Sequence, residues 1–314
     1  MTSAHRTAYE ALYGACVWLP LPAGSYVRLP GQDAKGWLQG QVTQDLRDLV
    51  PGDAAEACLL KPTGQIEAVM TIFVLEGGAV VSTTDPAPLK ERVRRFVIME
   101  DVRIEEAPYD CATLQGPDST TRLARLVEST ASNVASGVVN GLKVEAYRSP
   151  RTGPGGWDIV FPEGAGAAVR SALGDPTIGD EGLLHLAMLE IGSPVAGLDI
   201  GKKTLPPELG PQFESRYVSY KKGCYSGQEV MARIKSRGHT NLTWVRLAAE
   251  VQLDECTTLT APDGSEAGTV TRFVESPEQG TIGAAWVRNR WAEPGTTLRA
   301  EGTMVQVTAW PGLG

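Results

Sequence analysis

The chain has 314 residues, of which 42% are hydrophobic and 21% charged, a composition typical of a folded protein with two or three domains. Its formal charge of −8 argues against a nucleic acid or a membrane as a direct partner over a broad surface. The five cysteines lie far apart, and no Cys-x-x-Cys pair is present. We therefore expect free thiols in a reducing cytoplasm and no metal site.

The first third of the chain combines strand and helix patterns in a mixed order. This order favours an α+β lobe over a doubly wound parallel sheet, and we place that first lobe at residues 1–110. The expected elements are strands at 25–31 and 101–107, three strands between 54 and 85, and helices at 32–42 and 86–99.

A short pattern, Leu-x-Gly-x-Asp, occurs twice, at residues 29–38 (LPGQDAKGWL) and 114–123 (LQGPDSTTRL). Both copies lead from an apolar strand into a helix, and Asp33 is a plausible helix N-cap in the first. A strand, a glycine turn and a capping aspartate produce this pattern by themselves. The alternative is that the chain contains two related α/β lobes that pack with a ligand cleft between them.

The rest of the chain is expected to form a second lobe at residues 111–240 and a β-rich domain at 241–314. The second lobe begins with a hairpin at 141–162, continues with two helices at 166–174 and 180–192, and includes a long ordered loop at 192–215. After residue 241 no long helical pattern remains. Five or six short strands there predict a small barrel or sandwich.

Several common nucleotide-binding and hydrolase motifs are absent. The segment GLDIGKKT at residues 197–204 has three residues between its glycines where a phosphate loop needs four. The segment GAGAAV at 164–169 lacks the third glycine of a dinucleotide fingerprint. No Gly-x-Ser-x-Gly elbow occurs, so the sequence predicts neither an ATPase nor a serine hydrolase.

The segment KKGCYSGQE at residues 221–229 is the strongest candidate for a chemical site. Positive charge favours a thiolate over a thiol, and six Lys or Arg residues against the single acid Glu229 lie between Arg216 and His239. The alternative is that the lysines are solvated and Cys224 is a small buried side chain at a turn. A Cys224–His239 nucleophile pair is a further possibility that nothing in the spacing supports.

The segment KKGCYSGQEVMARIKSRG at 221–238 closely resembles the signature of the YgfZ-type folate-binding proteins, relatives of the glycine-cleavage aminomethyltransferase. The segments at 27–46 (VRLPGQDAKGWLQGQVTQDL), 59–66 (LLKPTGQI) and 189–200 (LEIGSPVAGLDI) are similar to further segments of that family. The cysteine motif is specific, whereas each other segment is weak by itself. Together the four segments extend over most of the chain.

The resemblance implies an α+β fold of two related lobes of the aminomethyltransferase folate-binding type and a small C-terminal β-barrel. It implies tetrahydrofolate, or a derivative, as the ligand. The implied role is to assist the assembly or repair of iron–sulfur enzymes, including enzymes that thiolate tRNA. The expected partners are therefore folate and iron–sulfur client enzymes.

Two residues of the motif would carry the chemistry. Cys224 would supply the thiolate, as a transient cluster ligand or a redox-exchanging group, and Lys222 would hold it ionised. Glu190 occupies the position of the family's pterin-facing glutamate, and its carboxylate can accept both pterin N–H groups. Without the family, Glu190 would be interpreted as an exposed acid at a helix end.

The other expected folate contacts are less specific. Tyr225 and Gln228 belong to the motif itself and are assigned to folate binding through it. The carboxylates of the folate tail would meet basic side chains from the same segment, either Arg233, Lys235 or Arg237.

The chain also departs from the family pattern. Met188 stands where the family has an arginine two residues before the glutamate. Ala68 and Val69 stand where the aminomethyltransferase has an aspartate, and Glu67 is one step early on the expected strand. Aminomethyl transfer is therefore disfavoured. A folate-dependent one-carbon transferase and an adaptor without either activity remain as alternatives.

Overall fold

The computed structural model describes residues 3–106, 108–153, 155–238 and 240–311, except for the side chains of Ser3, Ala4 and Arg237. The chain divides into two compact units. The first unit contains Met1–Lys61, Glu67–Leu184 and Tyr217–Ser226, and the second contains Pro62–Ile66, His185–Arg216 and Gly227–Gly314. The division into three domains at residues 110 and 240 stays a prediction.

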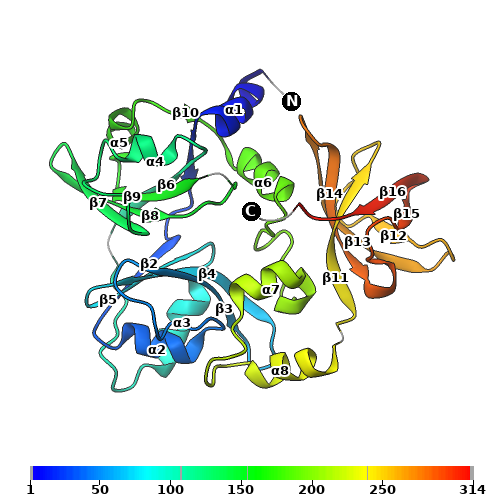
Figure 1. Cartoon of the computed structure of the whole chain (residues 1–314), viewed down its shortest axis with the longest axis horizontal. Coiled ribbons are helices and arrows are strands. Elements are labelled where there is room, and N and C mark those ends of the chain that lie inside the picture. The colour runs from blue at the N-terminus through cyan, green and yellow to red at the C-terminus, as the bar shows by residue number, and fades with distance from the viewer. Residues whose placement is uncertain (1–2, 107, 154, 239, 312–314) are drawn as a thin grey trace. The chain divides into compact units, whose positions relative to one another are not determined.

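The first unit contains two sheets, which together bear out the expected pair of related lobes (Figure 1). The four-stranded sheet has the order β2-β5-β4-β3, with bounds Tyr26–Pro30, Gly78–Thr83, Ile66–Leu75 and Ala54–Leu60. The six-stranded sheet has the order β10-β1-β6-β9-β8-β7, with bounds Thr177–Ile178, Val17–Leu21, Tyr109–Gln115, Gly156–Pro162, Leu142–Arg148 and Val134–Val139.

Each sheet is covered by helices on one face. Helices α2 (Ala34–Gln41) and α3 (Ala87–Phe96) lie against the four-stranded sheet, as Figure 1 shows, and α1 (Ser3–Gly14) precedes β1. In the first lobe, Val27 and Leu29 point into the helix-covered core, because alternate residues of a strand face the same side. In the second lobe, α4 (Ser119–Leu123) and α5 (Gly166–Ala172) cover the corresponding face.

The faces that the helices leave free pack against each other. Tyr26 and Phe73 from the four-stranded sheet form one buried cluster with Cys111, Tyr147 and Val160 from the six-stranded sheet. The ring centroids of Tyr26 and Tyr147 are 5.1 Å apart, and those of Phe73 and Tyr147 are 4.9 Å apart. Each lobe therefore buries both faces of its sheet.

The repeated Leu-x-Gly-x-Asp pattern corresponds to two equivalent turns. Gly31 and Gly116 both lie in left-handed backbone, with φ of 132° and 119°. A Cβ on Gly31 would lie 1.8 Å from the Asp101 carbonyl oxygen, so only glycine fits there. Asp33 is at the N-cap position as predicted, but its carboxylate caps no α2 amide and instead accepts the Asp101 N–H at 2.8 Å.

The strand expected at residues 101–107 is wrong. Among the described residues of this segment, only Glu105 forms an isolated bridge, with Arg28. The Asp101 carboxylate accepts the Gln32 N–H at 3.2 Å, and Arg103 and Glu105 donate their N–H groups to carbonyls of β2, so the segment runs beside β2 without forming a regular strand.

Three strands were not predicted from the sequence: β1, β7 and the two-residue β10. The two prolines in and after β1 obscure its pattern, yet Pro20 lies beyond the two residues that pair with β10. Its missing N–H therefore breaks no ladder on that side.

The second unit contains the predicted barrel, which closes in the order β11-β14-β13-β12-β15-β16. The bounds are Leu242–Ala249, Gly280–Arg288, Glu266–Ser276, Thr258–Thr260, Thr297–Ala300 and Thr303–Thr308, and a 3-10 turn, η2, covers Asn289–Trp291. The predicted helix α6 (Glu181–Glu190) is confirmed. The expected long loop at 192–215 in fact contains η1 (Pro206–Leu209) and most of α7 (Pro211–Tyr217), and α8 (Gln228–Arg237) precedes the barrel. None of the helices in the described part of the chain is both long and apolar enough to cross a membrane.

Candidate functional site

Cys224 is an exposed thiol on the segment Tyr217–Ser226 of the first unit, here named the cysteine loop. The interpretation as a buried filler of a turn is therefore wrong. Gly227, which follows the loop, requires left-handed backbone with φ of 85°. Gly223 lies outside that region, and a Cβ there would meet no atom within 4 Å.

Lys222, two residues before Cys224, is a buried cation that is 5% exposed. Its Nζ donates to the backbone oxygens of Gln39 at 2.5 Å, Val42 at 2.6 Å and Gln44 at 3.0 Å. Burial lowers the pKa of this ammonium to about 8, which still leaves it mostly protonated at pH 7. An ammonium has three N–H donors, so the three carbonyls use all of them. The ammonium therefore has no N–H left to donate to the Cys224 sulfur.

Thr43 joins the cysteine loop to the first lobe at two further points. Its hydroxyl donates to the Tyr217 carbonyl at 2.6 Å, and its own carbonyl accepts the Ser219 N–H at 3.0 Å. The same hydroxyl accepts the Cys58 N–H on β3 at 2.8 Å. Sequence reasoning missed Thr43, because a threonine after a short helix carries no signal of such distant partners.

Tyr225, which follows Cys224, is also a buried side chain of the cysteine loop. Its ring centroid lies 5.1 Å from the Lys222 Nζ, and its hydroxyl finds no hydrogen-bond partner among the described residues. Burial, with a smaller effect of Cys58, raises the pKa of this phenol to about 12. The exposed pair Gly223–Cys224 is therefore held between two buried side chains, Lys222 and Tyr225.

Glu190 belongs to the second unit and ends helix α6. It is 2% exposed, so the interpretation as an exposed acid is wrong. Its Oε1 accepts a hydrogen bond from the Ser276 hydroxyl on β13. Burial lowers the pKa of the nearby Arg246 guanidinium, and the Glu190 carboxylate acts in the opposite direction. The carboxylate thus lies in a polar environment made by the barrel.

The remaining expected folate contacts lie on α8. Gln228 is its first residue and is partly exposed, and Arg233 pairs with Glu229 at 3.0 Å on the exposed surface. Lys235 lies 3.9 Å from Glu214. The side chain of Arg237, and all of His239, lie outside the described residues. Because Lys222 is buried and Arg233 is paired with an acid, these cations do not form one uniform exposed patch.

Ala68 and Glu67, near the position where the aminomethyltransferase has an aspartate, both make contacts that stabilise the fold. Ala68 lies in the apolar core between the four-stranded sheet and its helices. Glu67 forms an ion pair with Arg92 of α3 at 2.5 Å. Among the described residues, no group of three or more His, Cys, Asp or Glu side chains is placed to hold a metal ion.

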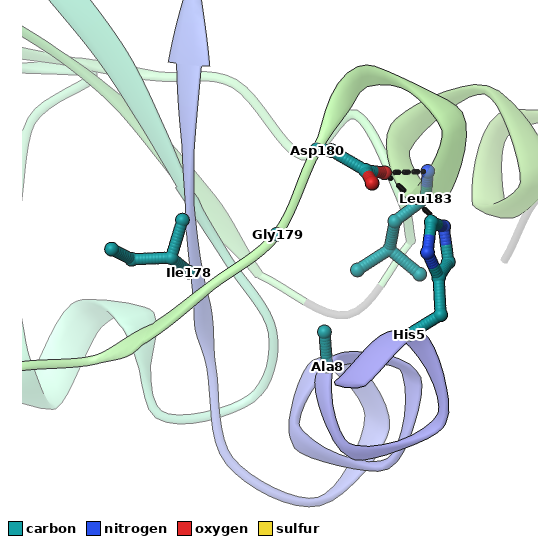
Figure 2. A pocket seen from close by; sticks show the side chains of 6 residues that line it. All are labelled: His5, Ala8, Ile178, Gly179, Asp180 and Leu183. Carbon is teal, nitrogen blue, oxygen red and sulfur yellow. Dashed lines mark hydrogen bonds and ion pairs between the residues drawn. The ribbon is translucent and has the colours of Figure 1, made fainter. Parts of the chain in front are cut away.

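A small pocket of about 200 Å³ lies elsewhere in the first unit, between α1 and the start of α6 (Figure 2). His5 Nε2 lies 3.2 Å from Asp180 Oδ1, which also accepts the Leu183 N–H at 2.9 Å and so caps α6. None of the predicted site residues lines this pocket. We therefore assign it no part in the candidate site.

Comparison with known protein families shows where this arrangement belongs. The family described as GCVT N-terminal domain matches residues 24–213. The chain belongs to this family. Its fold agrees with that assignment: a crystal structure of the glycine cleavage system aminomethyltransferase T from Bartonella henselae has a TM-score of 0.80 and covers 97% of this chain and 88% of that one, at 17% identity.

Curated relatives of this GCVT-family chain carry two different names. A "tRNA-modifying protein YgfZ" from Aliivibrio fischeri is 23% identical over 214 residues, which is 68% of this chain but only 64% of the relative's length. A mitochondrial aminomethyltransferase from Gallus gallus is 29% identical over 303 residues, 87% of this chain and 74% of the relative. The similarity to a YgfZ-type protein and to the aminomethyltransferases is thus confirmed.

Proposed function

We propose that this chain is a cytoplasmic, tetrahydrofolate-binding accessory protein that supports the assembly or repair of iron–sulfur enzymes, including tRNA-modifying ones, through Cys224. The observation that carries the proposal is the exposed thiol of Cys224 on a loop held at both sides by buried side chains. A buried thiol would be inert, whereas an exposed one can take part in thiol exchange or ligate a cluster transiently. The similarity to proteins named tRNA-modifying YgfZ supports the same proposal.

The folate assignment is supported by the chemistry of Glu190. A buried carboxylate is a suitable acceptor for the paired N–H groups of a pterin, and Glu190 is one of few acids in the described chain that are nearly fully buried. Its Oε1 already acts as a hydrogen-bond acceptor, from the Ser276 hydroxyl. Aminomethyltransferase relatives belong to the same family, which makes a reduced folate the ligand of choice.

A comparison of the two exposed cysteines tests the proposed role of Cys224. Cys224→Ala should abolish the activity of iron–sulfur-dependent tRNA-modifying enzymes in a strain that depends on this protein, with folate binding intact. Cys256→Ala, which removes the other exposed thiol, should leave that activity unchanged. Full client activity with Cys224→Ala would remove the thiol from the proposal.

A folate-dependent aminomethyltransferase is the second candidate, favoured by alignments to proteins of that name over 87% of the chain. The apolar surroundings of Ala68 argue against it, because no carboxylate is available there to assist at the folate nitrogen. A turnover assay with an aminomethyl donor and tetrahydrofolate separates the two functions. Measurable turnover that survives in Cys224→Ala would establish the transferase.

Calorimetry with tetrahydrofolate tests the ligand itself. Glu190→Gln should weaken binding by about tenfold or more, because a carboxylate–N–H bond is replaced by a weaker neutral one. Glu266→Gln, at an exposed glutamate that begins β13, is the matched control. No binding by the unsubstituted protein would leave the adaptor function as the better description.

A further inference from the structure

We propose that Lys222 is a positioning residue, whose ammonium clamps the cysteine loop onto the end of helix α2 and so fixes where the Cys224 thiol is presented. The inference rests on the proposed function only for its biological purpose. Its physical content is that the geometry of the three hydrogen bonds, and not the positive charge, is what Cys224 requires of Lys222.

The contact is built on an intrinsic property of helix ends. The last carbonyls of an α-helix have no intrahelical partner and carry the negative end of the helix dipole. Gln39 lies in the last turn of α2, and Val42 is its C-cap residue. The Lys222 ammonium satisfies both of their oxygens and that of Gln44, which lie 178 to 183 positions earlier in the chain.

The location of Lys222 makes it the last fixed point before the thiol. Tyr217 and Ser219 are bound by Thr43, and Lys222 is bound by the α2 end. Gly223, the next residue, is exposed, and a Cβ there would meet no atom within 4 Å. Without the Lys222 contact, the fixed points nearest to Cys224 would be Ser219, bound by Thr43, on one side and the buried Tyr225 on the other.

Four full-length variants separate geometry from charge, all with Cys256→Ser so that Cys224 is the exposed thiol. Lys222→Met removes the charge and the hydrogen bonds. Lys222→Arg keeps the charge, but a planar guanidinium cannot direct its N–H groups at three carbonyls that converge on one nitrogen. Lys221→Met removes the exposed neighbouring lysine and is the matched control, and the parent chain with Lys221 and Lys222 intact is the reference.

The first measurement is hydrogen exchange of the amides of the cysteine loop. Losing charge-assisted bonds to a buried cation should speed exchange at residues 219–226 by about 10- to 100-fold in both Lys222→Met and Lys222→Arg. Amides of the barrel strands should exchange as before, which distinguishes release of the loop from general destabilisation. Exchange in Lys222→Met no faster than in Lys221→Met would overturn the inference.

The second measurement is the rate of reaction of Cys224 with a bulky aromatic disulfide against pH. A positioning role predicts a changed limiting rate at high pH, where the thiol is fully ionised, with the midpoint pH unmoved. A charge role predicts the reverse: a midpoint raised in Lys222→Met, unchanged in Lys222→Arg, and an unaltered limiting rate. The second pattern would overturn the inference.

These measurements do not depend on the biological role. If the loop is released in Lys222→Met but client enzymes are active with Cys224→Ala, the proposed function fails and the positioning role stands. If Cys224→Ala abolishes client activity but Lys222→Arg preserves both loop protection and client activity, the proposed function stands and the positioning role fails.

Discussion

In each unit of the molecule a buried cation holds a loop in place, but Lys222 and Arg272 bind different kinds of partner. Lys222 in the first unit is 5% exposed and donates only to neutral carbonyls. Arg272 in the second unit is 4% exposed and binds the Asp199 carboxylate through Nε at 3.2 Å and a terminal nitrogen at 2.7 Å. Removing the Lys222 ammonium would leave no buried anion unpaired, whereas removing the Arg272 guanidinium would leave the Asp199 carboxylate without its counter-charge.

Further hydrogen bonds satisfy the buried ion pair between Arg272 and Asp199. Its carboxylate also accepts the Val195 N–H and the Thr271 hydroxyl, both at 2.9 Å, and Arg272 donates to the His185 carbonyl at 2.7 Å. A buried ion pair is costly to desolvate, so it is tolerated only when its remaining hydrogen bonds are satisfied. The comparison teaches that the loop around Asp199 is fixed by a network centred on one ion pair, and the cysteine loop by separate contacts of Lys222, Thr43 and the buried Tyr225.

The largest loss of stability is expected when the network around Asp199 is broken. Arg272→Met leaves the Asp199 carboxylate buried without its counter-charge and should lower the free energy of unfolding of the second unit by about 3–5 kcal/mol. Urea unfolding followed by tryptophan fluorescence measures it. Arg288→Met, at an exposed arginine of the same barrel, is the control, and an equal loss in both variants would contradict the comparison.

A smaller effect is expected where the cysteine loop meets Thr43. Thr43→Val keeps the shape but removes the hydroxyl that serves Tyr217 and Cys58, which should cost the first unit about 1–3 kcal/mol. Thr43→Ser keeps the hydroxyl and should recover most of that loss. Thermal unfolding of the three proteins tests this order; a valine variant as stable as the serine one would show that Thr43 does not hold the loop.

The turn at the end of the cysteine loop should respond more weakly. Gly227→Ala places a side chain in left-handed backbone and should cost about 1–2 kcal/mol, whereas Gly223→Ala should cost almost nothing. Differential scanning calorimetry on the two variants is the measurement. Equal melting temperatures would mean that the turn at Gly227 adjusts freely.

The smallest change in the free energy of unfolding is expected for the exposed ion pair on α8. Glu229 and Arg233 are 86% and 58% exposed, so their attraction is screened by water. Glu229→Gln should change the free energy of unfolding by less than about 0.5 kcal/mol, and Glu214→Gln serves as the half-buried reference. A loss comparable to that of Thr43→Val would show that charge on the surface matters more here than burial.

The sequence predicted the parts of the fold that depend on local patterns. The alternation in β2 to β5, the apolar spacing of α3 and α6, and the short strands of the barrel are all confirmed. The segment at 101–107 was expected to be a regular strand because its own residues alternate, whereas it forms only an isolated bridge to β2 and further hydrogen bonds to the turn that follows β2.

The candidate site was predictable in part. The glycines and the motif around Cys224 indicated an accessible thiol, and the resemblance indicated the family. The partners of Lys222 lie 178 to 183 positions away, a separation at which no local pattern carries information. The sequence therefore did not predict that Lys222 binds the end of α2, and its expected role in holding the Cys224 sulfur ionised stays a prediction.

The position of β1 has a consequence for biosynthesis. Val17 pairs with Gln115 of β6 and with Thr177 of β10, so β1 has no sheet partner until β6 has been translated. The four strands of the other sheet all precede residue 84 and have their neighbours much sooner. Nascent chains that stall near residue 100 should therefore carry a folded first sheet and an apolar N-terminal tail that chaperones can bind.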